Sequence, residues 1–190
     1  MATRWNGPRR AVRLGGLPFA AAALTATVAL YMALVAFGNV TDFGTNREFV
    51  RHVLAMDTTF KDDDLMWRAV TDRTLQDIAY VAIILWETLA AAVLVTGTVL
   101  WARGLTGRGA GYRRARRVST LGLVMVLLLF GAGFIGIGGE WFAMWQSQKW
   151  NGLQAAERNF VVAGFVLVLI HLPSPGGTPS GSWGRHSPEG

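Results

Sequence analysis

Residues 78–101 read IAYVAIILWETLAAAVLVTGTVLW, a long apolar stretch interrupted by a single charged residue, Glu87. A helix of about 20 apolar residues is long enough to cross the roughly 30 Å hydrocarbon core of a bilayer, because each residue advances it by about 1.5 Å. Lipid offers the backbone no hydrogen-bond partners, so helices are the usual way for such a run to span. The stretch therefore predicts a transmembrane helix.

Three further apolar runs give the chain four predicted spans. Two of them contain no charged residue, whereas the last is shorter and includes Glu157 and Arg158 near its start. A signal peptide is the alternative for the first run, but signal cores contain only about 7 to 15 apolar residues. We expect an all-α, four-helix transmembrane bundle in contact with the lipid bilayer, with spans at residues 17–37, 76–101, 119–139 and 154–172.

Charge in the connecting segments predicts the orientation, because basic residues resist translocation and stay in the cytoplasm. Segments 1–16 and 102–118 hold ten of the eighteen Lys and Arg residues and no acidic residue. The stretch 38–77 mixes five basic residues with eight acidic ones. We therefore expect both termini and the loop 102–118 in the cytoplasm, and the loops 38–75 and 140–153 outside.

Several functional classes are disfavoured by composition. The isoelectric point of about 10.7 would suit nucleic-acid binding, but these basic residues flank apolar spans, where anionic lipid headgroups attract them. The chain has no cysteine, so it has no thiolate metal site. His52, His171 and His186 fall at different predicted depths, so they predict no haem pair. We expect no nucleic-acid partner, no cofactor and no metal.

Glycines at positions 131, 133 and 136 spell G-x-G-x-x-G, the fingerprint of dinucleotide-binding proteins. That motif works only between a strand and a helix, and here it lies inside an apolar span. Small residues in a membrane helix instead let a neighbouring backbone approach closely. The pattern therefore predicts close helix packing.

The first outer loop is too long to lack structure of its own. Thr45 and Glu48 form a capping box, which predicts a helix start, and the apolar residues of 49–56 then recur at helical spacing. We expect a short amphipathic helix that forms a cap over the bundle.

Acidic residues farther along this loop predict two more helix starts, because carboxylates favour the positive end of a helix dipole. Asp62–Asp64 precede Leu65, and Asp72 and Asp77 lie at the start of the second span. A cation site at the Asp triplet is disfavoured because the spacing of a calcium loop is absent.

The second outer loop is rich in aromatic residues, which prefer the headgroup region of a bilayer. An aromatic belt accounts for Trp141, Phe142, Trp145 and Trp150, and for Trp67 and Trp101 elsewhere. The tail 173–190 is rich in Pro, Gly and Ser and is predicted to be disordered.

Glu87 is the sharpest single functional signal. It lies nine residues into the second run, near the bilayer midplane, where an acidic residue costs about 2.5–3.5 kcal/mol. It must therefore face the bundle. It is either a proton relay or ligand contact, or a structural hydrogen bond, for example to Thr88 or to a threonine of another span.

Two sets of segments resemble a known family. The first reads NVTDFGTN at 39–46, FVRHVLAMDTTF at 49–60 and LMWRA at 65–69; the second reads GGEWFAMWQS at 138–147 and WNG at 150–152, with Ala156 and Arg158 after it. The chain resembles bacterial predicted small integral membrane proteins, domain of unknown function 2165, over roughly residues 17–173. The resemblance implies a four-span protein of the bacterial inner membrane and implies no activity.

Both matching sets lie on the predicted outer face, where they bring polar and aromatic residues to one entrance. The cluster would either bind an anion, a polar headgroup or a partner, or form ion pairs that pin the outer loop onto the bundle. Its candidate residues are Asp42, His52, Asp57, Arg68, Glu140, Trp141, Trp145, Asn151 and Arg158.

Three functions follow from these patterns. The first is a non-catalytic docking, assembly or accessory protein whose outer cap contacts a membrane-protein partner or a second copy, since aromatic residues and Arg favour binding surfaces. The second is a proton-linked transporter or sensor that uses Glu87. The third is an enzyme acting on lipid headgroups, with Asp57 or Glu140 as general base and Arg68 or Arg158 holding the anion.

Overall fold

The structure is a computed structural model that describes residues 16–106 and 112–173. The predictions of a cytoplasmic basic amino terminus and of a disordered tail concern residues that lie almost entirely outside these ranges. Within them the secondary structure is helical, with no strand, as the apolar runs predict.

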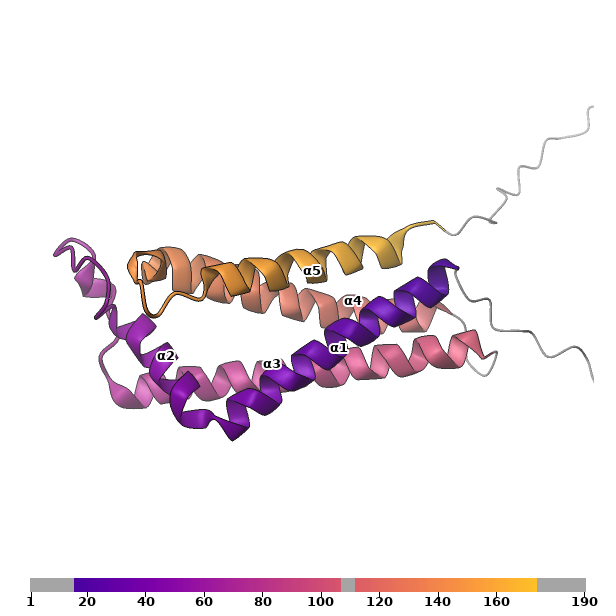
Figure 1. The fold of residues 1–190 in the computed structure, drawn as a ribbon, viewed down its shortest axis with the longest axis horizontal. Coiled ribbons are helices and arrows are strands. Elements are labelled where there is room, and N and C mark those ends of the chain that lie inside the picture. The colour runs from indigo at the N-terminus through magenta and orange to yellow at the C-terminus, as the bar shows by residue number, and fades with distance from the viewer. Residues whose placement is uncertain (1–15, 107–111, 174–190) are drawn as a thin grey trace, which may run out of the picture.

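Four long helical segments form the bundle (Figure 1). They are α1 (Leu17–Thr41), α3 (Arg73–Leu105), α4 (Tyr112–Leu127) with its π-helical continuation η2 (Leu128–Trp141), and α5 (Leu153–His171). All four are long and apolar enough to cross a membrane. The prediction of an all-α protein with four membrane-spanning helices is confirmed.

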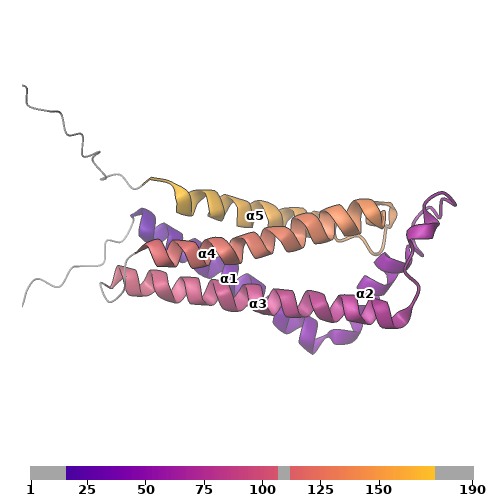
Figure 2. The same cartoon turned by 180° about the vertical axis from the view of Figure 1, so that it is seen from behind.

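The remaining helical segments gather at one end of the bundle, which we call the cap end (Figures 1 and 2). They are α2 (Phe43–Ala55), η1 (Met66–Arg68) and η3 (Met144–Gln146), the last two being single 3-10 turns. The start of α1, the end of α3, the start of α4 and the end of α5 lie at the opposite end, which we call the connector end (Figure 1).

The helix in the first loop begins earlier than its capping box predicts. Asp42 alone separates α1 from α2, because α1 continues until the Asp42 amide donates to the Gly38 carbonyl. Helix α2 therefore starts at Phe43, and Thr45 already lies inside it. The predicted cap at Thr45 is wrong. Asp72, in contrast, caps α3 as predicted, since its carboxylate accepts from the Leu75 amide at 2.9 Å.

One face of α3 is buried at the centre of the bundle. Buried residues recur every three or four positions along it, which is the period of a helix face. The opposite faces of the spans expose large apolar side chains, among them Leu30, Leu34 and Leu89, each more than half exposed. Such a surface would be unfavourable in water and is expected in hydrocarbon. The buried face of α3 consists of Gln76, Tyr80, Ile84, Glu87, Ala90, Ala91, Leu94, Gly97 and Trp101.

Small residues bring α3 close to α4. A Cβ added at Gly97 would lie 2.5 Å from the Ser119 hydroxyl, and one at Gly122 would lie 2.7 Å from Leu94. Ser119 also accepts a hydrogen bond from the Trp101 indole at 3.0 Å. Trp101 is 2% exposed, so its assignment to an aromatic belt is wrong. It fills the interface between α3 and α4.

The glycines of η2 fall into two groups, one packed against α5 and one without close neighbours. Gly131 and Gly139 face α5, where an added Cβ would lie 2.6 Å from Phe160 and 2.8 Å from Leu153. These two positions confirm the prediction of close helix packing. Gly133 and Gly136, which belong to the same motif, meet nothing closer than 3.5 Å.

Candidate functional site

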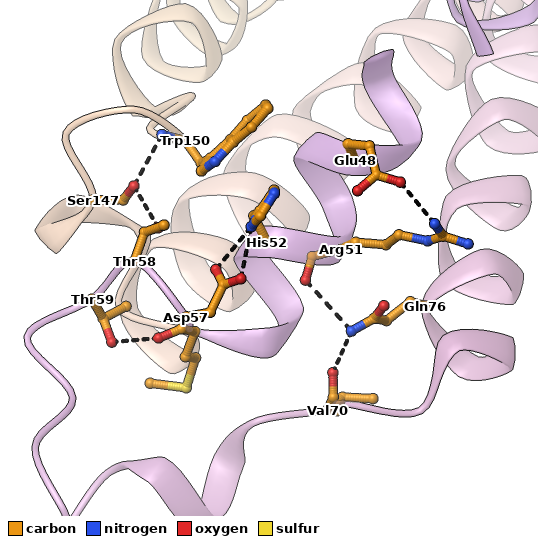
Figure 3. Close-up of polar contacts among 11 residues, drawn as sticks. Glu48, Arg51, His52, Asp57, Thr58, Thr59, Val70, Gln76, Ser147 and Trp150 are labelled. Atoms are coloured by element: carbon orange, nitrogen blue, oxygen red, sulfur yellow. Dashed lines mark hydrogen bonds and ion pairs between the residues drawn. The ribbon is translucent and has the colours of Figure 1, made fainter. Parts of the chain in front are cut away.

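The cap helix is held onto α3 by a charged contact. Arg51 of α2 donates from Nε and Nη2 to the two carboxylate oxygens of Asp77, each at 3.0 Å, and from Nη1 to Glu48 at 2.7 Å. Figure 3 shows the contact between Arg51 and Glu48. A guanidinium that binds one carboxylate through two nitrogens also fixes the relative orientation of the two side chains. Asp77 therefore holds the cap helix in addition to lying near the start of a span.

A buried amide fastens the return of the loop. The Gln76 side chain is 2% exposed, and its Nε2 donates to the Val70 carbonyl at 2.7 Å and to the Arg51 carbonyl at 3.5 Å (Figure 3). The Val70 amide donates to the Leu54 carbonyl at 2.8 Å. Buried backbone groups need such partners, so the segment leading into α3 is tied to the end of α2.

The two loops of the cap end are joined directly. The hydroxyls of Thr58 and Ser147 lie 2.8 Å apart, and the Phe60 amide donates to Gln146 at 2.9 Å. The Ser147 hydroxyl also accepts from the Trp150 amide at 2.9 Å (Figure 3). The Thr58–Ser147 and Phe60–Gln146 contacts join residues 89 and 86 positions apart, so they hold the two loops together.

An apolar cluster lies beneath these contacts. Met56, Phe142 and Ala143 pack together and are at most 7% exposed. Met56 and Ala143 have φ angles of 51° and 49°, in the left-handed region that residues with a Cβ rarely adopt. Packing on both sides must compensate for this strain, which is typical of segments whose shape is fixed by tertiary contacts.

His52 and Asp57 form a pair on the surface of the cap. The His52 Nδ1 atom lies 2.8 Å from an Asp57 carboxylate oxygen, and its ring stacks on Trp150 with centroids 4.6 Å apart (Figure 3). The Ser147 hydroxyl already binds Thr58 and Trp150. Within the part of the chain that the structure describes, no nucleophilic side chain is hydrogen-bonded to this pair.

Two sets of aromatic contacts lie at the cap end, and we call their residues together the aromatic rim: Phe60, Trp67, Arg68, Trp141 and Trp145. The rings of Phe60 and Trp145 pack edge to face with their centroids 5.9 Å apart, and those of Trp67 and Trp141 do so at 5.6 Å. The Arg68 guanidinium lies 4.9 Å from the Trp141 ring and 5.6 Å from the Trp67 ring. The exposed fractions are 71% for Phe60, 70% for Trp67, 46% for Trp141 and 51% for Trp145.

The structure brings some of the predicted site residues together and leaves others apart. His52 contacts Asp57, Arg68 contacts Trp141, and Trp145 joins the aromatic rim through Phe60. Asn151 accepts from the Leu153 amide at the start of α5. Across residues 16–106 and 112–173, no ion pair or side-chain hydrogen bond joins Asp42, Glu140 or Arg158 to the other candidates.

Sequence reasoning missed the residues that build the cap: Arg51, Gln76, Asp77, Gln146 and Ser147. Their signal was weak, because each has a common surface role in isolation. Only Gln76 had a position that could have indicated its role, because it lies two residues before the apolar run 78–101 and in register with Tyr80 and Glu87.

Glu87 lies near the middle of α3 and is 2% exposed. Its Oε2 accepts from Asn39 Nδ2 at 2.6 Å, while the Tyr80 hydroxyl donates to the Asn39 carbonyl at 2.9 Å. The neighbouring Thr88 binds the Ile84 carbonyl of its own helix. The hydrogen-bond partner of Glu87 is thus an asparagine at the end of α1, and not a threonine.

Metal-binding side chains do not gather in the described ranges. No group of three or more His, Cys, Asp and Glu residues there is arranged to hold an ion. The carboxylate of Asp62 accepts from the Asp64 amide, which is a local turn contact.

Four long apolar helices joined by a folded cap define a multi-pass integral membrane protein. The chain belongs to the family described as predicted small integral membrane protein, domain of unknown function 2165, whose model matches residues 17–173. No curated protein matches the chain significantly. No solved structure does so either.

Proposed function

We propose that this protein is a non-catalytic accessory or assembly protein of the bacterial inner membrane. Its cap end docks a basic extracytoplasmic segment of a second membrane protein. The observation that carries this proposal is the aromatic rim, in which four large side chains from two loops stand exposed in fixed pairs.

The rim has the composition of a binding surface. Tryptophan and arginine are the residues that most often dominate the energy of protein interfaces. Its aromatic pairs are set before binding, because the loops beneath them are joined by the contacts of Thr58, Phe60, Gln146 and Ser147. A surface ordered in advance loses less conformational entropy when a partner arrives.

Charge around the rim indicates the chemistry of the partner. Asp62, Asp63, Asp64 and Glu140 are exposed, and no described residue forms an ion pair with them. Carboxylates beside open indole rings favour lysine and arginine, which bind both groups. Arg103 in the last turn of α3 and Arg113, Arg114, Arg116 and Arg117 in the first turns of α4 lie at the connector end, which supports a cytoplasmic connector end and an extracytoplasmic cap.

The same contacts argue against catalysis at the cap. The polar side chains with the chemistry for a reaction are engaged with one another, as in the pairs His52–Asp57 and Thr58–Ser147. The proposed anion-holding residue Arg68 is occupied by two indole rings, and Arg158 lies exposed on α5. A lipid-headgroup enzyme would need these groups to converge on one reacting atom.

Site-specific photocrosslinking in the native membrane tests the proposal. A photoreactive benzoylphenylalanine at position 67 or 145 is expected to give one heteromeric adduct of the same discrete mass from both sites. The same group at Leu89, which faces lipid on α3, is the control and should give none. Replacing Asp62, Asp63 and Asp64 together by Asn should lower the adduct yield several-fold at an unchanged protein level.

Three results would overturn the proposal. Adducts only with a second copy of the chain would make the rim a homo-oligomer interface. Adducts only with lipid would make it an aromatic belt at the bilayer surface. A heteromeric adduct that is insensitive to the three Asn substitutions would remove the basis for a basic partner.

A further inference from the structure

An apolar cavity of about 230 Å³ lies between the cap helix and the membrane domain. Its walls include Phe49 and Val53 of α2, Ala79 and Ile83 of α3, and Gly133 of η2. Every residue that lines it is apolar or glycine. Glu87 is not among them, so the cavity is separate from the polar contact between α1 and α3.

The chemistry of the walls limits what the cavity can hold. Charged or hydrogen-bonding groups would lose their water partners there without replacement, and water itself avoids purely apolar cavities. An apolar cavity of about 150 Å³ is known to take up benzene, whereas whole drug-sized ligands need about 300–1,000 Å³. The volume therefore suits several carbons of a flexible hydrocarbon chain better than a complete cofactor.

The cavity continues into the surface that faces lipid. Ile137 lines it and is also 55% exposed on the outside of η2. Because the chain is an integral membrane protein, the molecules at that surface are bilayer lipids, present at very high local concentration. Hydrocarbon chains thus reach the opening without leaving the membrane.

Some glycines of η2 pack against a neighbouring helix, whereas others line the cavity. At Gly131 and Gly139 an added Cβ would lie within 3 Å of the Phe160 and Leu153 side chains, so these two glycines pack against α5. Gly133 and Gly138 line the cavity, where an added Cβ would meet nothing closer than 3.8 Å and 3.5 Å. Packing between the spans therefore does not explain these two glycines. Side chains there would project into the cavity and fill it. The surrounding π-helical geometry is rare in proteins and is frequent at functional sites.

We propose that this cavity binds one acyl chain of a bilayer phospholipid. The chain lies between η2 and the apolar face of α2 and holds the cap helix against the membrane domain. Binding is independent of the headgroup, because the walls offer it no polar contact. The site does not depend on the docking function of the aromatic rim.

The test uses the full chain in nanodiscs that contain phosphatidylglycerol with a photoactivatable diazirine in mid-chain. Mass spectrometry of the irradiated protein is expected to find adducts on Phe49 and Val53, as well as on the lipid-facing Leu89. Gly133→Leu should lower the α2 adducts several-fold and leave those at Leu89 unchanged. Gly136→Leu is the matched control, since Gly136 belongs to the same helix but is exposed and does not line the cavity.

A thermal readout accompanies the crosslinking. Adding phosphatidylglycerol back to delipidated protein in detergent should raise the Tm of the wild type and of Gly136→Leu, but not that of Gly133→Leu. Phosphatidylethanolamine should raise the Tm of the wild type by the same amount as phosphatidylglycerol. Ala79→Leu fills the cavity from the opposite wall and replaces Gly133→Leu if the latter does not fold.

The proposal is overturned if a folded Gly133→Leu or Ala79→Leu keeps the wild-type adducts on α2. It is also overturned if only one of the two phospholipids raises the Tm of the wild type, because recognition would then lie outside the apolar cavity. Adducts confined to lipid-facing positions such as Leu89 would show that the cavity takes up no chain.

Discussion

The side-chain amide of Asn39 donates a hydrogen bond to the carboxylate of Glu87 over 2.6 Å, joining the last turn of α1 to the middle of α3. The Asn39 backbone carbonyl accepts a second hydrogen bond from the Tyr80 hydroxyl, about two turns before Glu87 on α3. A single asparagine thus connects α1 to two points on the buried face of α3. This arrangement makes Glu87 a structural contact between spans.

Substitutions at Glu87 separate a structural role from a titrating one. Glu87→Gln keeps an acceptor for Asn39 and should change the free energy of unfolding by less than about 1 kcal/mol, whereas Glu87→Ala leaves the buried amide unpaired and should cost about 1–3 kcal/mol. Unfolding in mixed micelles by titration with dodecyl sulfate measures both. Thr88→Ala is the control, because Thr88 is exposed and binds only its own helix. A Glu87→Gln variant as unstable as Glu87→Ala would show that the carboxylate itself is required for the contact between α1 and α3.

The spans were predictable because hydrophobic length alone sets them, and α1, α3, α4–η2 and α5 contain the four apolar runs. Helix ends were less predictable. Thr45 and Glu48 have the spacing of a capping box, but α1 continues to Thr41 and starts the next helix sooner than local sequence indicates. Trp101 likewise has a residue type that favours the bilayer interface, and its partner Ser119 on the next span draws it inside.

The candidate site was predictable as a region more than as a set of contacts. Topology places Arg68 and Trp141 at the same end, and the structure brings them within 4.9 Å. Topology does not choose among the many charged residues of that face, which is why Arg51 and Gln76 were missed. Their importance comes from partners about 6 to 26 positions away in the chain, and no local pattern encodes those distances.

Two glycines in long helices should respond to alanine in opposite directions. At Gly97 the new Cβ meets Ser119 at 2.5 Å at the hydroxyl and 3.2 Å at the backbone amide, so overpacking should destabilise the protein by about 1–3 kcal/mol. At Gly38 nothing lies within 4 Å, and the better helix propensity of alanine should stabilise it by about 0.5–1 kcal/mol. Melting curves of both variants in one detergent provide the comparison. Equal effects would mean that α3 and α4 do not approach as closely as Gly97 and Ser119 indicate.

The contact between Arg51 and Asp77 should control how firmly the cap helix is held. Arg51→Lys removes the paired geometry while keeping the charge, because an ammonium group cannot bind both carboxylate oxygens in the same fork. We expect limited proteolysis between Asp57 and Asp64 to be several-fold faster in Arg51→Lys, and faster still in Arg51→Ala. Arg47→Ala is the matched control on the same helix, since Arg47 contacts Glu48 at 4.0 Å and the Phe43 ring, at 5.8 Å from its centroid, both within α2. If exchanging the charges, as in Arg51→Asp with Asp77→Arg, restores nothing, the two residues do not act as a pair.

Orientation in the membrane can be tested with two single cysteines, because the chain has none of its own. Asp63→Cys lies in the exposed loop of the cap end, and Thr106→Cys follows α3 at the connector end. The positive-inside rule predicts that the connector end lies in the cytoplasm. A membrane-impermeant maleimide applied to cells whose outer membrane alone has been opened should therefore label position 63 and not position 106. Position 106 should react only after the inner membrane is permeabilised. The opposite pattern would place the aromatic rim in the cytoplasm, and any partner of the cap end would then have to be sought on that side.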